Sequence, residues 1–138
     1  MVSARWREAR YAIGIHPHAA GAFGDHPARA AGQLGGAVAA QPLARAIGEI
    51  GLDYHYDLAP RDAQRTVFRQ QIRLARDLRL PIVIHSREAE DDTFNILAEE
   101  SAGEVGGVFH CFTGGREMAR RALDAGFHLS LSGIVTFP

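Results

Sequence analysis

Acidic and imidazole side chains of the kind that bind divalent metal ions recur directly after short apolar runs in this sequence. Glu49, His85 and His110 each follow such a run, and a fourth run ends at His16 and His18. Carboxylate oxygens and imidazole nitrogens together suit Mg²⁺, Mn²⁺ or Zn²⁺. Ions held in this way activate water and stabilise the charge that develops on a phosphoryl or acyl group. The pattern therefore indicates metal-assisted hydrolysis.

Each of these residues also has a purely structural explanation. A single histidine at a strand end is more often a satisfied polar residue than a ligand, and Glu49, in a glycine-flanked turn, could pair with an arginine. Their recurrence at successive strand ends favours a metal site. Cys111 is not counted as a ligand, because neighbours on a strand point to opposite faces. If His110 points inward, Cys111 points into the helix layer.

The segments that must position these side chains alternate between strand and helix patterns. Strands are predicted at residues 11–15, 44–50, 82–84, 108–112 and 127–132, and helices near 27–34, 61–79, 88–100 and 116–124. In the helix at 61–79 the apolar residues recur at helical spacing, and the glutamines, Gln64 and Gln71 included, are assigned to the polar face. Alternating βα units imply a parallel sheet, either closed into a barrel or open and doubly wound.

Composition sets the frame for this α/β fold. With 138 residues, 46% of them hydrophobic and 22% charged, the chain is expected to form a single soluble domain over residues 1–138. It has no apolar run of the ~18 residues that a membrane span needs, so no membrane partner is expected. One cysteine fits a reducing cytoplasm. A net charge of −1 argues neither for nor against a nucleic acid partner.

Five segments resemble, in order, the signature segments of the TatD family of metal-dependent deoxyribonucleases. They lie at residues 14–18, 48–54, 81–87, 110–114 and 130–137. The resemblance implies a TIM-like (β/α)8 barrel, in which active sites form at the carboxyl ends of the strands. It also implies a hydrolase that cleaves phosphodiesters at the 3′ end of single-stranded DNA, using water activated by two divalent ions. Mg²⁺ or Mn²⁺ is expected, with Zn²⁺ as an alternative.

The resemblance assigns roles to individual residues of this chain. Glu49 is expected to be catalytic and to bridge the two ions, while His85 and His110 each bind metal. His16 is expected near the substrate phosphate. Arg87 is a candidate phosphate contact, since a guanidinium can bind two phosphate oxygens at once. Asp53 is expected to orient a metal-binding group from behind.

The sequence also departs from the family pattern at both ends. The family carries a His-x-His pair on its first strand and a metal-binding Asp in a Glu-Thr-Asp context on its last strand. Nothing before His16 supplies the pair, and no Glu-Thr-Asp occurs before Pro138. By this mapping the chain holds strands three to seven of eight, an incomplete barrel with reduced metal affinity and activity. Its exposed edges near Tyr11 and Leu129 would favour association.

Two other functions remain open from the sequence. Related barrels use similar ligands to hydrolyse amides, esters or lactones. Alternatively, the chain is a non-catalytic remnant that associates with itself or with a complementary fragment.

Overall fold

The computed structural model describes residues 6–23 and 26–137 of the chain. Five strands form one sheet in chain order, and every neighbouring pair is parallel. The strands are β1 (Tyr11–Ile13), β2 (Ala44–Asp53), β3 (Ile82–Arg87), β4 (Gly107–Phe109) and β5 (Phe127–Leu129). The predicted succession of parallel βα units is therefore confirmed.

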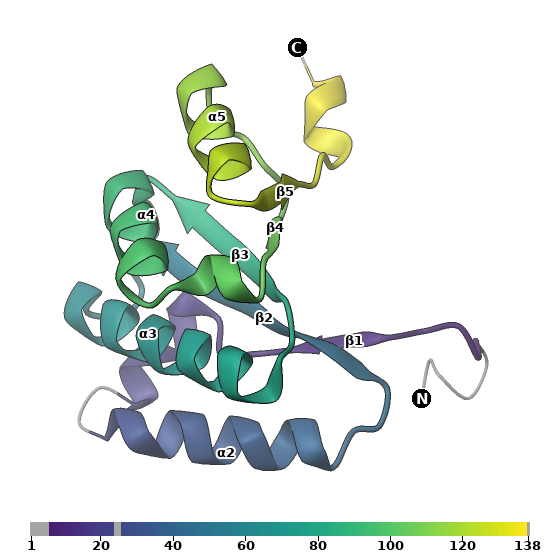
Figure 1. The fold of residues 1–138 in the computed structure, drawn as a ribbon. Coiled ribbons are helices and arrows are strands. Elements are labelled where there is room, and N and C mark those ends of the chain that lie inside the picture. Colours follow the sequence, from purple (N-terminus) through teal and green to yellow (C-terminus); the bar gives the residue numbers. More distant parts are fainter. Residues whose placement is uncertain (1–5, 24–25, 138) are drawn as a thin grey trace.

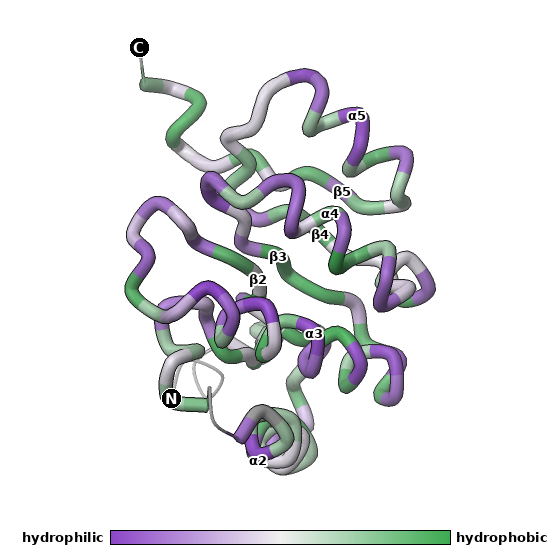
Figure 2. The backbone as a smooth tube through the Cα atoms, turned by 90° about the vertical axis from the view of Figure 1, so that its left-hand side faces the viewer, coloured by the Kyte–Doolittle hydropathy of each residue, from purple (hydrophilic) through white to green (hydrophobic). Residues whose placement is uncertain are grey.

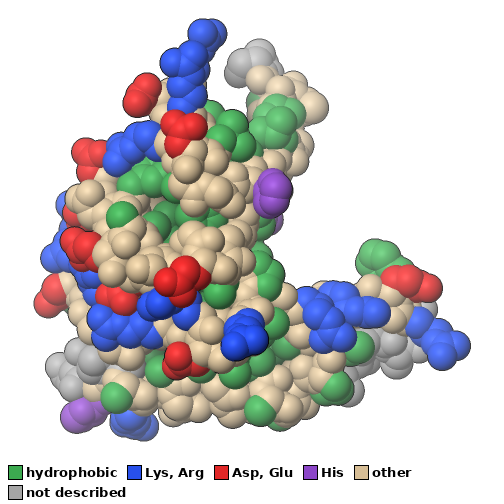
Figure 3. Space-filling model, viewed as in Figure 1, with side chains coloured by type: hydrophobic (Ala, Val, Ile, Leu, Met, Phe, Trp, Pro, Cys, Tyr) green, Lys and Arg blue, Asp and Glu red, His purple; other side chains and the backbone are tan. Residues whose placement is uncertain are grey.

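Four α-helices follow one another along one side of this curved sheet (Figure 1). They are α2 (Pro27–Ala39), α3 (Arg61–Leu78), α4 (Glu90–Glu99) and α5 (Arg116–Asp124). Three short 3₁₀ helices accompany them: η1 (Pro17–Phe23) before α2, η2 (Ala102–Glu104) after α4 and η3 (Gly133–Thr136) after β5. The other side of the sheet is hollow (Figure 3). Within the described ranges, no helix combines the length and apolar character that a bilayer crossing would need.

The core lies between the sheet and α3. Ile50 and Leu52 of β2 and Ile84 of β3 are fully buried in one cluster with Phe68 and Ile72 of α3. Apolar residues dominate the inner strands of a parallel sheet because helices cover them. Figure 2 shows the hydrophobic stretch of β3 inside helices whose turns alternate between hydrophobic and hydrophilic residues.

The prediction that the strand ends near Ile50 and presents Glu49 at a glycine-flanked turn is wrong. β2 continues to Asp53, and Glu49 lies in its middle. Gly48 pairs with Val83, and Ile50 pairs with Ile84, the next residue of β3, so Glu49 is the extra residue. Bulges re-aim a side chain in this way.

The glycine at position 51 is explained by the same close pairing of β2 with β3. Gly51 lies opposite His85 in the ladder and has a φ of +140°. A Cβ atom at this position would collide with the backbone carbonyl of His85. Glycine is therefore required by the approach of the two strands, and not by a turn.

The helix predicted at 61–79 is confirmed as α3, but the assignment of its glutamines is wrong. Gln64 and Gln71 are 0% and 1% exposed, on the buried side of the helix. They are seven residues apart, which places them on one face two turns from each other. Their amides bind backbone groups of the neighbouring strand ends, so the polar side chains are buried without being unsatisfied.

Candidate metal centre

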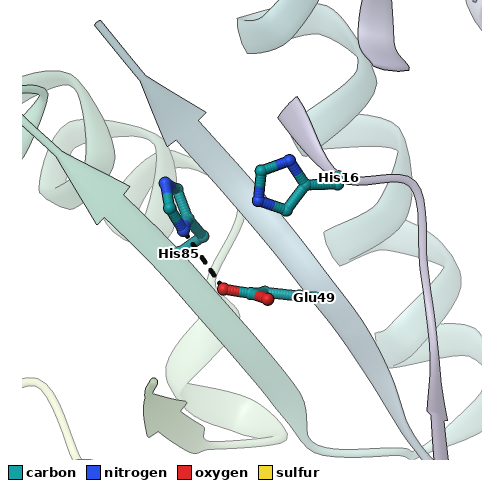
Figure 4. Close-up of side chains that lie close together, drawn as sticks. All are labelled: His16, Glu49 and His85. Atoms are coloured by element: carbon teal, nitrogen blue, oxygen red, sulfur yellow. Dashed lines mark hydrogen bonds and ion pairs between the residues drawn. The ribbon is translucent and has the colours of Figure 1, made fainter. Parts of the chain in front are cut away.

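His16, Glu49 and His85 converge at the carboxyl edge of the sheet. One ligand atom from each of them lies within 4.8 Å of the others. Figure 4 shows the three side chains pointing toward one another from β2, β3 and the segment after β1. His85 Nδ1 lies 3.1 Å from Glu49 Oε1. Three predicted site residues are thus brought together by strands far apart in the sequence.

Asp53 lies behind this group and is completely buried. Its Oδ2 atom is 2.9 Å from both His85 Nε2 and His18 Nε2. Its Oδ1 atom accepts hydrogen bonds from the backbone N–H groups of His55, at 3.1 Å, and Tyr56, at 2.8 Å. A carboxylate that holds one ring nitrogen of a histidine leaves the other nitrogen directed at a metal position. Here that second nitrogen, Nδ1, faces Glu49.

The electrostatics of the group favour ionised carboxylates around a cation. Burial raises the pKa of Asp53, but hydrogen bonds from the Tyr56 backbone, His18 and His85 outweigh it and bring the pKa to about 2. The hydrogen bond from His85 lowers the pKa of Glu49 more than burial raises it. Burial lowers the pKa of His85, yet its bonds to Glu49 and Asp53 raise it overall. Positive charge is therefore stabilised between the two acids.

The pKa of His16 shifts in the opposite direction to that of His85. Burial, followed by the nearby His85 and His18, lowers the pKa of His16, so the ring is neutral at pH 7. Its Nδ1 atom accepts a hydrogen bond of 3.3 Å from the backbone N–H of His18. The neutral ring therefore carries its proton on Nε2. Such a ring is suited to donate a hydrogen bond.

The sequence did not identify the residues that hold these side chains in place. Gln71 binds Ile15 just before His16: its Oε1 accepts the N–H of Ile15 at 2.7 Å, and its Nε2 donates to the carbonyl at 3.0 Å. Gln64 binds the backbone of Asp53 in the same manner, at 2.8 Å and 3.1 Å. The seven-residue spacing of the two glutamines, in phase with buried positions, is the signal that could have revealed them.

His110 is exposed and lies outside the group of three. β4 ends at Phe109, and the backbone N–H of His110 donates to the carbonyl of Ile84 at 2.8 Å. His110 and His85 line one cavity of about 300 Å³. An electrostatic interaction with His110 also contributes to the lowered pKa of Glu49. Metal binding by His110 stays a prediction.

The prediction that Cys111 points away from His110 into the helix layer is wrong. Its Sγ atom is 3.2 Å from His110 Nε2, and it lines the same cavity. The alternation of side chains applies only within a strand. Here β4 has already ended, and Cys111 adopts a positive φ of 47°.

Arg87 is exposed at the end of β3, two residues after His85. Residues two apart on a strand face the same side of the sheet, so Arg87 and His85 point to one face. Both line the cavity that also contains His110. A contact of Arg87 with phosphate stays a prediction.

The side chains present fit a divalent ion bound by nitrogen and oxygen. Glu49 supplies a carboxylate and His85 an imidazole, which are common ligands of Zn²⁺ and of other first-row divalent ions. His85 also has the carboxylate partner that metal-binding histidines typically have. A parallel βα sheet with this group toward the carboxyl ends of its strands is typical of barrel-type metal-dependent hydrolases.

Comparisons with known proteins agree with this class. The model of the TatD related DNase family matches residues 2–138, so the chain belongs to this family. The uncharacterized metal-dependent hydrolase YabD of Bacillus subtilis is 55% identical over 92 residues, which cover 67% of this chain and 36% of YabD. The 3′-5′ ssDNA/RNA exonuclease TatD of a Pantoea species is 38% identical over 122 residues, covering 88% of this chain and 45% of that protein.

Solved structures show the same fold. The crystal structure of YjjV, a TatD homologue from Escherichia coli, superposes with a TM-score of 0.83 at 28% sequence identity. The match covers 99% of this chain and 52% of YjjV. The five parallel strands and their four α-helices are therefore part of a TIM-type barrel, and the chain spans about half the length of the relatives it matches, or less.

Proposed function

We propose that this chain carries part of the active site of a phosphodiesterase that removes nucleotides from the 3′ end of single-stranded DNA. The observation that carries the proposal is the convergence of His16, Glu49 and His85, with Asp53 buried behind His85. The Pantoea relative is named a 3′-5′ ssDNA/RNA exonuclease, which supports a nucleic acid substrate. Two Mg²⁺ or Mn²⁺ ions are the proposed cofactor, and Glu49 would help to hold them.

A divalent ion at this centre would polarise a phosphoryl oxygen and lower the pKa of a water molecule. Glu49 and His85 would hold it, and His110 is the proposed further ligand. Glu49 is ionised at neutral pH, and its Oε1 atom faces His85 Nδ1 at 3.1 Å, so these two atoms would hold the ion. Its second oxygen, Oε2, is the proposed acceptor for the proton that the attacking water loses.

Substrate binding is assigned to His16 and Arg87. The neutral His16 ring donates from Nε2 to a phosphate oxygen, because its Nδ1 is occupied by the backbone of His18. Arg87 lies on the same face as His85 and can bind two phosphate oxygens through its guanidinium group. Together the two side chains would fix the phosphate against the centre.

Degradation of a 5′-labelled single-stranded oligonucleotide tests this proposal. With Mg²⁺ or Mn²⁺ the wild type should shorten the strand from its 3′ end, and Glu49→Gln should lower the rate about a hundredfold or more. Glu117→Gln is the matched control, because it removes an exposed carboxylate on α5. Equal rates for wild type and Glu49→Gln would contradict the proposal. Ester and lactone substrates in parallel test the acyl alternative.

A further inference from the structure

An exposed aromatic ring borders the candidate centre and has no role in the mechanism above. Tyr56 follows β2 by three residues and keeps 52% of its surface exposed. The neighbouring Tyr54 is half-buried and bonds Asp92 at 2.6 Å, which gives it a structural role between β2 and α4. Tyr56 has no comparable hydroxyl partner among the described residues.

The position of Tyr56 is tied to the same buried carboxylate that orients His85. Its backbone N–H donates to Asp53 Oδ1 at 2.8 Å. Its ring meets the His18 ring edge to face at a centroid distance of 5.7 Å, and His18 Nε2 lies 2.9 Å from Asp53 Oδ2. His18 in turn lies 6.2 Å from the His85 ring. The aromatic ring is thus held at a fixed place beside the centre while much of it faces solvent.

The guanidinium group of Arg87 lies over the Tyr56 ring. The guanidinium carbon of Arg87 lies 4.8 Å from the centroid of Tyr56. Within residues 6–23 and 26–137 no carboxylate forms an ion pair with Arg87, so its charge is available for a ligand. Exposed aromatic rings beside guanidinium groups are the surfaces on which single-stranded nucleic acids bind: bases stack on the rings, and phosphates pair with the cations.

We propose that Tyr56 forms the stacking contact for an unpaired nucleobase at the end of a nucleic acid strand, while Arg87 binds the adjacent phosphate. The inference deepens the proposed function and rests on it. A base can stack on Tyr56 only when it is free of its partner strand, so the contact would select single-stranded ends. Neither specificity for one base nor discrimination between DNA and RNA is expected, because every base has a stacking face.

Binding of a single-stranded octadeoxynucleotide tests the inference without catalysis. The strand carries fluorescein at its 5′ end and, at its 3′ end, either thymidine or an abasic residue, and anisotropy is measured in EDTA. Tyr56→Ala should weaken binding of the normal strand roughly fivefold to hundredfold. Tyr56→Phe should bind as the wild type does, because it keeps the ring. Leu58→Ala is the matched control, since Leu58 is 66% exposed in the same loop.

The abasic strand separates stacking from a general loss of affinity. The wild type should bind it as weakly as Tyr56→Ala binds the normal strand, and Tyr56→Ala should bind both strands alike. An unchanged affinity for Tyr56→Ala overturns the inference, and so does an equal loss on both strands. Metal-dependent cleavage that requires Glu49 but not Tyr56 would leave the proposed function intact and remove only this inference. A wild type that neither binds nor cleaves the strand would remove both.

Discussion

At the scale of single residues, Asp53 connects most of the candidate centre. Its two oxygens receive His18, His85 and two backbone N–H groups, and its backbone is held by Gln64. Because these donors stabilise the ionised carboxylate, protonation of Asp53 is disfavoured. Its pKa therefore falls to about 2, although burial alone would raise it. The Asp53 carboxylate is therefore ionised at neutral pH.

Asp53→Asn should weaken Mn²⁺ binding about tenfold to a hundredfold, because the amide no longer orients His85 with a full negative charge. Titration calorimetry measures this affinity. Asp124→Asn, at the exposed end of α5, is the control for the loss of one charge. If Asp53→Asn and Asp124→Asn bind Mn²⁺ equally well, Asp53 does not support a metal ligand.

Gly51→Ala should destabilise the fold by at least about 2 kcal/mol, since it forces an L side chain into an unfavourable φ and against the backbone of His85. Denaturant unfolding measures the change. Gly36→Ala is the control, because a Cβ atom there meets open space on α2. That substitution should be neutral or stabilising by up to about 1 kcal/mol. A similar small effect at both glycines would show that β2 and β3 can move apart.

At the scale of elements, the order and parallel arrangement of the strands were predictable, whereas their ends and fine register were not. β2 ends at Asp53 and not near Ile50, and β4 ends at Phe109 and not at Phe112. Glu49, His85 and His16 follow apolar runs, and parallel strands bring such positions to one edge. The bulge at Glu49 depends on how β2 pairs with β3, which no local pattern encodes. The bond between His18 and Asp53 joins residues 35 positions apart and could not be predicted for the same reason. The burial of Gln64 and Gln71 could have been inferred from their spacing.

Helix α3 should contribute to the centre through Gln71. Gln71→Leu leaves the N–H and carbonyl of Ile15 without their partners, so it should cost about 1–3 kcal/mol of unfolding free energy. Because Ile15 precedes His16, weaker Mn²⁺ binding should accompany the loss of stability. Gln70→Leu, one residue earlier on α3, should change neither quantity by more than about 0.5 kcal/mol. Equal effects of the two substitutions would show that the hydrogen bonds from Gln71 to Ile15 do not support the centre.

Ion pairs join α3 to α4 and η2 on the outer side of the sheet, where Figure 3 shows charged side chains gathered. Glu100 is the best buried of them and bonds Arg73 Nε and Nη2, both at 2.7 Å. The hydrogen bond from Arg73, together with Arg69, lowers the pKa of Glu100 although burial opposes the shift.

Glu100→Gln should therefore cost about 1–3 kcal/mol at pH 7 and progressively less in acid. A carboxylate with a lowered folded-state pKa stabilises the fold above its unfolded pKa, near 4.5, and loses this contribution as the pH falls through the folded value. Urea unfolding of both proteins at pH 7, 5 and 3 measures the difference. A difference that is constant across this range would show that the charge of Glu100 is not what stabilises the helices.

At the scale of the whole molecule, the parallel sheet has two roles. The carboxyl ends of its strands carry the candidate metal ligands, and its helix-covered face forms the hydrophobic core. The chain belongs to the TatD related DNase family, and it spans about half the length of the relatives it matches, or less. The ligands of this chain come from consecutive βα units, so they can converge without the rest of a barrel. The affinity of these ligands for a divalent ion therefore decides whether the chain forms a metal centre.

Titration of Mn²⁺ into the wild type, Glu49→Gln and Glu117→Gln tests that point most directly. We expect saturable Mn²⁺ binding by the wild type and by Glu117→Gln, and an affinity for Mn²⁺ at least about tenfold lower for Glu49→Gln. Circular dichroism of the three proteins in EDTA should be the same, which separates lost ligation from lost structure. Wild type and Glu49→Gln binding Mn²⁺ equally, or neither binding it saturably, would contradict the assignment of Glu49 and His85 as metal ligands.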